Sequence, residues 1–527
     1  MLTLRAAASL LARADSLANL APIAAAIGCV ELPAPLDSNS IRALGIDSAI
    51  ETAHIAAGPG ALRTLMLEVC AGFGLRELLP RLASRLSTRA PHVLWLLLVV
   101  QRDDSDIAIA AWSGDRRPPR VAALLADRAR LVDSDAETLR ALAAVATTNG
   151  APVRDLLVHS RWVEVLGREA LSIRFYRALE RSVSEMAASS EVGSDDTRSE
   201  LALLNASRLL FLAFLEAKGW LDGNPAFLAH QFEQCSARGG GFHARVSRPL
   251  FFGTLNTPVR KRARAARAFG RIPFLNGGLF SRTPLERRHR ALSFSDDAFG
   301  TLIYDVFGRF RFTAREEVTS WSEAAVDPEM LGRAFESLMA SRERRHTGAF
   351  YTPFSLVERV AERGIDALEL RDRTSLERAT ILDPACGSGA FLVYTLERVA
   401  RLLAEAGDAR DVSTIRRDVL TRSIFGVDIN PTAVWLCELR LWLSVVIESE
   451  VRDPMSIEPL PNLDRNIRVG NALGAGAFDA QVSHNAQLRT IRERYVRAVG
   501  IRKASLARML DRAERTRALE TVDAELL

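Results

Sequence analysis

The spacing of hydrophobic positions divides the chain into regions with different predicted structures. The apolar patterns of Val93–Val100 and Asp106–Trp112 predict two neighbouring strands. Ala- and Leu-rich segments with helical periodicity, such as Glu137–Ala146, flank these strands. We therefore predict a mixed α/β N-terminal domain over residues 1–186, in which no residue pattern points to a particular chemistry.

A helical region follows a polar segment. Met186–Ser199 is polar, small and without a capping pattern, so we predict a linker or mobile loop. Helical patterns dominate residues 200–345, with predicted loops at Gly239–Gly241 and Asn276–Gly278. The Glu-x-Lys triplet Glu216–Lys218 lies within helical periodicity. This favours an exposed helix pair over the strand that an Asp and Glu-x-Lys nuclease requires.

A third region contains a strand, a glycine loop and a helix in succession. Thr380–Asp383 predicts a short buried strand, Gly387 and Gly389 lie in the loop, and apolar helical spacing continues to Leu403. Nucleotide-binding α/β folds place this arrangement at the carboxyl edge of a parallel sheet. Glycines allow the backbone to approach a ligand closely because no Cβ intervenes. Taken alone, the segment is also compatible with an ordinary strand-to-helix turn.

Two more predicted strands favour the ligand-binding interpretation. Ser423–Asp428 ends in an acidic residue, which is where such folds hydrogen-bond ribose hydroxyls. After a predicted helix over Ala433–Val446, the segment Asn466–Leu473 predicts a third strand. Its residue Asn471 carries an amide that can read a purine edge. The three segments together predict a site for a nucleoside-containing ligand.

Charge adds little to this picture at the level of the whole chain. The formal net charge of +5 permits nucleic-acid binding without requiring it. Nearly all positive charge is arginine, a bias that codon usage in a GC-rich genome produces by itself. Arg260–Arg271 contains six basic residues, and the residues alone favour a solvated helix face over a phosphate contact.

Cysteine and apolar content exclude several classes of protein. The five cysteines form no Cys-x-x-Cys pair, and no histidine cluster has zinc spacing, so we predict neither disulfides nor a metal site. Arg5, Arg13 and Asp15 interrupt the apolar N-terminal stretch, which argues against a signal peptide. The longest apolar run elsewhere is too short for a membrane helix. We expect a cytoplasmic protein with no membrane partner.

The motifs resemble those of the gamma-class N6-adenine DNA methyltransferases of bacterial restriction-modification and phage-defence systems. Thr347–Pro353 is similar to motif X of that class, and the three strand segments follow as motifs I, II and III, in the order the class uses. Ile272–Phe280 and Asp327–Glu336 are similar to segments that precede motif X in type IIG restriction enzymes. The Asp-Pro-Ala-Cys-Gly-Ser-Gly loop differs from a dinucleotide-binding Gly-x-Gly-x-x-Gly, so NAD is disfavoured.

This resemblance implies that residues 346–475 form a subdomain that binds S-adenosyl-L-methionine. The residue types agree, since a carboxylate suits a diol, an amide suits a purine edge and glycines permit close approach. Cys386 is expected to pack rather than react. The implied cofactor-binding residues are Tyr351, Thr352 and Pro353 at the methionine end, Asp383, Ala385, Gly387 and Gly389 in the loop beneath it, Asp428 on the ribose hydroxyls, Ile429 on the adenine ring face and Asn471 at the adenine amino group.

Motif IV, which holds the target adenine in this family, is missing from the sequence. The motif is Asp, Asn or Ser followed by Pro-Pro and an aromatic residue, and the only Pro-Pro here, Pro118–Pro119, lies between arginines. We therefore assign no catalytic residue. The predicted fold class is α/β: a partial Rossmann-like class I methyltransferase sheet with strands 1–3 only, preceded by a largely helical domain and a mixed α/β N-terminal domain. The free edge of Thr380–Asp383 would need cover from the tail, a partner chain or further sequence.

The expected function follows from this resemblance. Residues 476–527 predict a basic helical tail of one or two helices, the start of an insertion that precedes motif IV in relatives. We expect an adenine-specific methyltransferase of double-stranded DNA that is inactive alone. It would need a second polypeptide or a missing C-terminal part carrying motif IV and the target-recognition domain. The alternative is a non-catalytic S-adenosyl-L-methionine- or DNA-binding subunit of a defence complex. An RNA or protein methyltransferase is disfavoured because motif X precedes motif I.

Overall fold

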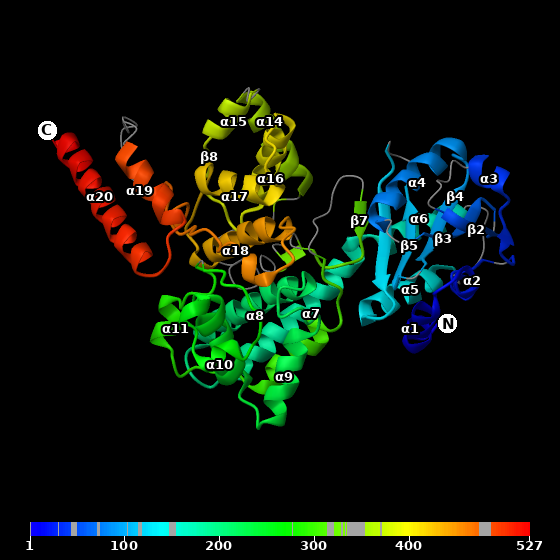
Figure 1. The fold of residues 1–527 in the computed structure, drawn as a ribbon, viewed down its shortest axis with the longest axis horizontal. Coiled ribbons are helices and arrows are strands. Elements are labelled where there is room, and N and C mark those ends of the chain that lie inside the picture. Colours follow the sequence, from blue (N-terminus) through cyan, green and yellow to red (C-terminus); the bar gives the residue numbers. More distant parts are fainter. Residues whose placement is uncertain are drawn as a thin grey trace. The chain divides into compact units, whose positions relative to one another are not determined.

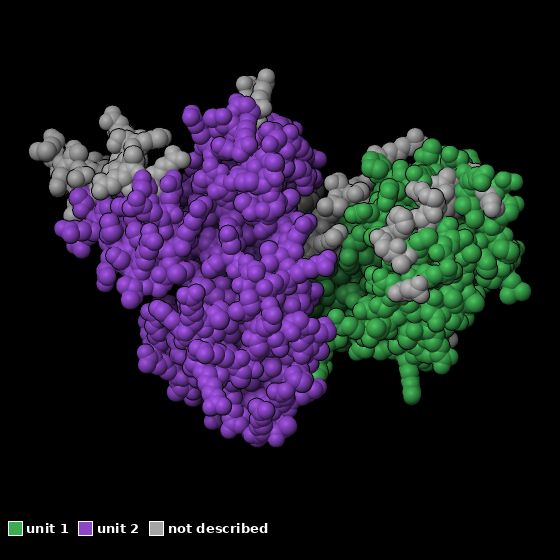
Figure 2. Space-filling model, viewed as in Figure 1, with its two compact units in different colours: residues 1–179, 303–327 green, residues 180–302, 328–527 purple. Residues whose placement is uncertain are grey.

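The structure is a computed structural model with two compact units (Figure 2). Unit 1 comprises residues 1–179 and 303–327, and unit 2 comprises residues 180–302 and 328–527. The structure describes all residues except 1, 30, 44–49, 59, 71–73, 103, 114–117, 147–153, 277, 314–320, 328–329, 332–333, 335–351, 353, 369–371, 474–485 and 527.

Unit 1 is built on a seven-stranded mixed sheet in the order β1-β2-β3-β4-β5-β6-β7 (Figure 1). Its strands are β1 Ala34–Pro35, β2 Ile50–Ala57, β3 Leu62–Val69, β4 Leu94–Gln101, β5 Asp106–Trp112, β6 Val121–Asp127 and β7 Trp321–Glu323. The pairs β3–β4 and β6–β7 are parallel and the others antiparallel. The predicted neighbouring strands are confirmed as β4 and β5, with Leu98 opposite Ile109.

Helices bury both faces of this sheet. One hydrophobic cluster joins the sheet to α1, α2, α5 and α6, and a second joins the opposite side chains of the same strands to α4. Both clusters are rich in Leu, Ile, Val and Ala, whose burial stabilises the fold by roughly 25 cal/mol per Å². The helices of unit 1 are α1 Leu4–Arg13, α2 Leu17–Ala26, α3 Ser38–Ala43, α4 Leu75–Arg89, α5 Asp133–Ala146, α6 Arg154–Leu166 and the first part of α7 Arg168–Ala188.

The segment 303–327 lies in unit 1, although the sequence analysis included it in the helical region of residues 200–345. Strand β7 extends the sheet because Trp321 pairs with Val121 of β6. Glu323 then forms a salt bridge of 2.8 Å with Arg76 of α4. A three-residue strand has too little periodicity to be recognised along the chain, so only long-range pairing assigns it to this sheet.

The linker predicted over Met186–Ser199 is confirmed only for residues 189–194, because α7 and α8 take up its two ends. Helix α7 continues to Ala188, and α8 begins at Asp195, so the connection between them is short. Ser194 caps α8, because its side chain accepts a hydrogen bond of 3.3 Å from the backbone N–H of Thr197. The Ser and Asp residues that indicated a linker are capping and first-turn residues, which favour a helix start.

Unit 2 contains a helical part centred on α8, which is buried from Leu201 to Leu215. The helix predicted around Glu216–Lys218 is confirmed, but the prediction of an exposed pair is wrong. Both side chains are partly buried, and Lys218, just after the helix, donates hydrogen bonds to the carbonyls of Ile447 and Ser449. The elements of this part are α8 Asp195–Ala217, α9 Phe227–Ala237, η1 His243–Ser247, η2 Pro249–Leu255, η3 Val259–Lys261, α10 Arg264–Arg267, α11 Pro284–Arg288, α12 Asp296–Gly300 and η4 Thr301–Phe307, whose last residues fall in unit 1.

The second part of unit 2 is a three-stranded parallel sheet in the order β10-β9-β8. All three predicted strands are present: β8 Ile381–Asp383, β9 Ile424–Asp428 and β10 Ile467–Val469. Within the described residues β8 pairs with β9 only, and the side chain of Leu382 is 61% exposed. The accompanying helices are α14 Phe354–Ala367, α15 Arg373–Arg378, α16 Ala390–Glu405, α17 Val412–Arg422, α18 Pro431–Ile447 and η5 Pro454–Ser456.

The tail forms two helices, α19 Ala486–Val496 and α20 Gly500–Leu526, as predicted. A small apolar cluster that includes Tyr495 and Leu510 joins them. The hairpin attaches on the β10 side of the sheet, where Arg468 of β10 forms a salt bridge of 2.8 Å with Glu514. The sequence suggested the tail, a partner chain or further sequence as cover for the edge of β8. The described part of the tail packs beside β10 instead, so it does not cover β8.

Candidate functional site at the carboxyl edge of the parallel sheet

The loop after β8 is held in a conformation that requires glycine at one position and leaves open space at another. Gly389 has φ +86° and precedes α16; a Cβ there would lie 2.6 Å from Sγ of Cys437. Gly387 also has a positive φ, +51°, but a Cβ there would meet no described atom within 4 Å. Gly389 thus serves packing, whereas Gly387 faces space in which a ligand has room.

Asp428, the last residue of β9, connects this loop to the second strand. Its Oδ2 accepts a hydrogen bond of 2.8 Å from the backbone N–H of Gly387, and its Oδ1 accepts one of 2.9 Å from that of Asn430. Two backbone donors fix the plane of the carboxylate, and each oxygen retains a lone pair for a further donor. The predicted ribose-binding residue is therefore oriented before any ligand arrives.

A second carboxylate lies at the same edge. Asp383 ends β8, and its Oδ1 accepts a hydrogen bond of 3.1 Å from the backbone N–H of Ala385. Burial raises the pKa of Asp383, and the neighbouring charge of Asp428 raises it further. Two acidic groups held close together favour a ligand that offers hydroxyl donors or positive charge.

The end of β10 reaches the same place. The backbone N–H of Gly470 donates a hydrogen bond of 2.9 Å to the carbonyl of Asp428. Asn471 follows at an exposed position, with its Oδ1 accepting 3.0 Å from the backbone N–H of Leu473. Ile429 is 67% exposed, which is unusual for an isoleucine next to a buried strand. The end of β10 therefore lies beside Asp428 and Ile429, and the contact is made by Gly470, the residue before Asn471.

Of predicted motif X, Thr347–Pro353, the structure describes Thr352 alone, which is partly buried; Tyr351 and Pro353 lie outside the described residues with the rest of the motif. The helix that follows, α14, packs against α16. Glu362 of α14 accepts hydrogen bonds from the Tyr394 hydroxyl at 2.7 Å and from Nε of Arg398 at 2.8 Å. Motif X is therefore followed by a helix tied to the same helix that follows the glycine loop.

Arg440 is a supporting residue that sequence reasoning missed. It is buried on α18, and its Nη1 donates hydrogen bonds to the carbonyl of Ser388 at 3.1 Å and to its Oγ at 3.0 Å. A guanidinium that binds a loop carbonyl and hydroxyl together restricts the loop more than a single bond would. The signal was available, because an arginine within the apolar segment Pro431–Ile447 needs a buried partner.

Cys386 packs beneath the loop, as expected. Its side chain shares a hydrogen bond with Cys437, which, together with burial, raises the pKa of the Cys437 thiol. Gly426 of β9 leaves room for the pair, since a Cβ there would lie 3.1 Å from Sγ of Cys386. A buried thiol with a raised pKa is a poor nucleophile, so this pair supports the loop rather than reacting.

A buried polar cluster around Glu438, the residue after Cys437 in α18, anchors the tail. Burial and the nearby charge of Asp464 raise the pKa of Glu438 to about 8, while Lys503 opposes this shift. The Tyr495 hydroxyl donates a hydrogen bond of 2.7 Å to Asp464. A Cβ at Gly278 would lie 3.4 Å from Oε2 of Glu438, so the predicted loop of the helical part reaches the same cluster.

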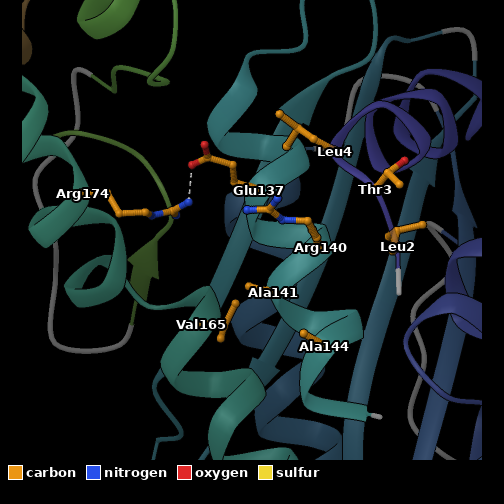
Figure 3. Close-up of a pocket in the computed structure, with 9 residues that line it drawn as sticks. All are labelled: Leu2, Thr3, Leu4, Glu137, Arg140, Ala141, Ala144, Val165 and Arg174. Carbon is orange, nitrogen blue, oxygen red and sulfur yellow. Dashed lines mark hydrogen bonds and ion pairs between the residues drawn. The ribbon is translucent and has the colours of Figure 1, made fainter.

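A separate cavity of about 700 Å³ lies in unit 1 (Figure 3). Its wall carries the ion pair between Arg174 and Glu137, together with Arg140 and apolar side chains such as Val165. No residue predicted for ligand binding lines it. In the described part of the chain, acidic, His and Cys side chains form no group that could hold a metal ion, and none of the helices offers an apolar stretch that could span a bilayer.

Comparison with known proteins shows that part of this chain is similar to a family of DNA methylases. Residues 326–453 match the family model described as N-6 DNA Methylase. A putative type II restriction enzyme and methyltransferase of Methanocaldococcus jannaschii is 26% identical over 329 residues, which cover 53% of this chain and 28% of that protein. The adenine-specific methyltransferase PglX of Streptomyces coelicolor is 40% identical over 76 residues, covering 14% of this chain and 6% of that protein.

Among solved structures, the type IIL restriction-modification enzyme MmeI in complex with DNA is similar, with 20% identity and a TM-score of 0.40; the match covers 58% of this chain and 41% of that one. The chain thus spans about a quarter of the length of the archaeal relative and a smaller share of PglX.

Proposed function

We propose that this chain, whose residues 326–453 match the N-6 DNA Methylase family model, binds S-adenosyl-L-methionine and forms the cofactor-binding part of an adenine-specific DNA methyltransferase. The setting would be a restriction-modification or phage-defence system. The observation that carries the proposal is the Asp428 carboxylate, held by the backbone N–H groups of Gly387 and Asn430 where the ends of three parallel strands meet. A fixed carboxylate at this edge suits the vicinal hydroxyls of a ribose.

The residues present fit the cofactor on chemical grounds. Open space beside Gly387 allows close approach, and the paired carboxylates of Asp383 and Asp428 suit hydroxyl donors and a cationic group. Ile429 would cover the adenine ring face and Asn471 would meet its amino group. When bound, the cofactor supplies an activated methyl group. Arg440 would act as a positioning residue, because it holds the carbonyl and hydroxyl of Ser388 within the loop.

The remaining roles are proposed on the family resemblance. Tyr351, Thr352 and Pro353 would line the methionine end, and Ala385 and Gly389 would complete the loop beneath it. Residues 346–475 would form the binding subdomain, between the helical part and the tail of residues 476–527. Tyr394 and Arg398, which hold α14 against α16, would keep the motif X segment close to the loop.

We further propose that the three strands are half of a class I methyltransferase sheet. The order β10-β9-β8 with β8 at the edge matches strands 3, 2 and 1 of that fold, in which strand 4 pairs with strand 1. The exposed Leu382 side chain marks the position. Motif IV does not occur in the sequence, so methyl transfer would require a polypeptide segment that brings strand 4, motif IV and the target-recognition domain to this edge.

The binding step is tested by calorimetric titration of the full chain with S-adenosyl-L-methionine. We expect measurable binding that Asp428→Ala weakens at least tenfold, because the ribose hydroxyls lose their acceptor. Glu405→Ala, an exposed carboxylate at the end of α16, is the matched control and should bind as the parent does. Equal affinity of the Asp428→Ala variant and the parent, with unchanged thermal melting, would refute the ribose assignment.

A non-catalytic binding subunit is the second candidate, favoured by the absence of motif IV from the sequence. The two candidates predict different genomic neighbourhoods. A segment or adjacent gene encoding Asn-Pro-Pro followed by an aromatic residue supports the enzyme. If such a segment is found, adding its product to the purified chain should produce methylation of adenine in duplex DNA, and the chain alone should show none.

A further inference from the structure

Positive charge is concentrated in one segment of unit 2. Residues 238–290 contain 13 Lys and Arg residues and a single acidic residue, Glu286, which makes their net charge +12. The whole chain has a net charge of +5, so the other residues together carry −7. Codon bias towards arginine would act on the entire chain, and it does not explain why the positive excess occurs in one tenth of the sequence. The segregation therefore calls for a structural or functional reason.

The structure shows that this segment folds around η2. Arg248 precedes η2, and its guanidinium donates a hydrogen bond to the carbonyl of Arg290. The guanidinium of Arg282 lies 4.5 Å from the ring centroid of Phe252, within η2. On the same element, the Thr254 hydroxyl contacts the carbonyl of Ala266 in α10. Basic residues from separate parts of the segment thus gather around one short helix.

Most of these side chains are exposed, although Arg245, Arg267 and Arg287 also donate hydrogen bonds to nearby backbone carbonyls. Arg262 is buried and donates to the carbonyls of Ile272 and Pro273. The other basic residues are exposed except Arg248, which is half-buried. The exposed members are Arg238, Arg245, Arg260, Lys261, Arg264, Arg267, Arg271, Arg282, Arg287, Arg288 and Arg290.

Acidic side chains near this surface mostly accept hydrogen bonds from its backbone rather than pair with its basic side chains: Asp296 accepts from the N–H groups of Gly241 and Phe242, and Asp222 accepts from that of Arg271. Glu286 is engaged by Arg208, a fully buried residue of α8, through a salt bridge of 2.6 Å. Among the described residues, the salt bridges of the segment's own basic residues are limited to that of Arg271 with Asp453 at 2.7 Å. The pKa of Arg248 is lowered by burial and then by the nearby Arg282. Like charges held together without counter-charges are unfavourable until an anion binds.

We propose that this basic surface, made by the exposed Lys and Arg residues of 238–290, binds the sugar-phosphate backbone of duplex DNA. Guanidinium groups bind phosphates in a two-pronged geometry, and a dense row of them without acidic residues is typical of backbone contacts. The choice of duplex DNA over another polyanion rests on the proposed function. The presence of the basic surface rests on the charge and exposure of its residues alone. The interaction would be independent of base sequence and would help to place the substrate next to unit 2.

The surface is tested on the full chain with a 20-base-pair duplex, measuring affinity by fluorescence anisotropy over a series of salt concentrations. The test variant replaces Arg260, Lys261, Arg264 and Arg290 with Gln. These side chains are exposed, so the folded core is kept. The control variant makes the same change at four exposed arginines of unit 1, Arg5, Arg13, Arg42 and Arg81, and has the same net charge.

We expect the test variant to bind DNA at least tenfold more weakly at about 0.1 M salt. The slope of log affinity against log salt should fall by about 0.9 for each DNA phosphate that the variant no longer neutralises. The control should retain affinity within about twofold and an unchanged slope. Equal decreases in the affinity of both variants, or an unchanged slope in the test variant, would overturn the proposal. So would tighter binding of phosphatidylserine vesicles than of DNA.

The same two variants separate this inference from the proposed function. Both should bind S-adenosyl-L-methionine with the affinity of the parent chain, because none of the replaced residues lies at the carboxyl edge of the parallel sheet. If Asp428→Ala leaves cofactor binding unchanged while the basic-surface variant loses DNA affinity, the cofactor site is wrong and the basic surface is retained. If Asp428→Ala weakens cofactor binding while the basic-surface variant keeps its DNA affinity, the basic surface is wrong and the cofactor site is retained.

Discussion

The two sheets of this protein use their strands in opposite ways. In unit 1, Leu98 and Val99 at the middle of β4 are fully buried, one on each face, because helices cover both sides of the seven-stranded sheet. In unit 2, Leu382 of β8 is 61% exposed and Val469 of β10 is 54% exposed. The first sheet uses its strands to build a core, whereas the short strands of the second present their carboxyl ends, and among the described residues β8 pairs on one side only. Exposed apolar side chains at such an edge support the proposal that a further polypeptide segment pairs with β8.

The largest difference should appear when one leucine of each sheet is truncated. We expect Leu98→Ala to lower the free energy of unfolding of the transition that includes unit 1 by about 3 kcal/mol, because apolar burial is reduced and a cavity is left behind. Leu382→Ala should change unfolding by less than about 1 kcal/mol, since much of the side chain is already in water. Urea denaturation followed by circular dichroism measures both. Comparable decreases would show that β8 is covered in solution.

The next effect in size concerns the glycine loop after β8, where one glycine serves packing and the other faces space for a ligand. Gly389→Ala places a methyl group 2.6 Å from Sγ of Cys437 at a positive φ, so we expect about 2 kcal/mol of destabilisation. Gly387→Ala meets open space and should cost about 1 kcal/mol from backbone strain alone. Thermal melting measures stability, and calorimetry measures cofactor affinity. Gly387→Ala should weaken binding more than its small effect on melting suggests; unchanged binding would place the ligand elsewhere.

The smallest expected effect concerns pH and the cluster that anchors the tail. The pKa of Glu438 is raised from 4.5 to about 8, so the folded protein holds a proton that the unfolded chain releases between these values. Stability from this group is therefore fully present below about pH 4.5 and is lost as pH rises through about 8. We expect the melting temperature of Glu438→Gln to fall less than that of the parent between pH 6 and pH 8, by on the order of one degree or more. Glu405→Gln, at an exposed site, should follow the parent; identical profiles for all three would remove the buried-proton assignment.

Local patterns predicted much of the fold. The apolar runs indicated β4, β5, β8 and β9, and the 3.6-residue spacing indicated α16 and the tail helices. These predictions succeed because burial on a strand or helix face imposes its own period on the sequence. Two predictions failed in part, each for its own reason. The polar residues before α8 were capping residues, and β7 is too short to show a period.

The candidate site was predictable in its residue types but not in its connections. Asp428 follows a strand and Gly387 lies in a glycine loop, so both could be selected from the sequence. Their hydrogen bond joins residues 41 positions apart, and no local pattern records it. Arg440 was overlooked because its partner, Ser388, lies 52 positions away. The proposed basic surface likewise combines separate segments, since Arg248, Arg282 and Arg290 lie outside the run Arg260–Arg271.

The sequence by itself determined which segments are strands, helices and glycine turns, and it determined the family resemblance through the order of its motifs. Local sterics and side-chain periodicity act over a few residues, which is why this information is readable along the chain. Only the tertiary structure decided that Gly389 packs on Cys437, that the tail lies beside β10 and that, within the described part of the chain, β8 pairs with β9 alone. Those outcomes depend on contacts between distant segments, whose free energies exist only once the chain has folded.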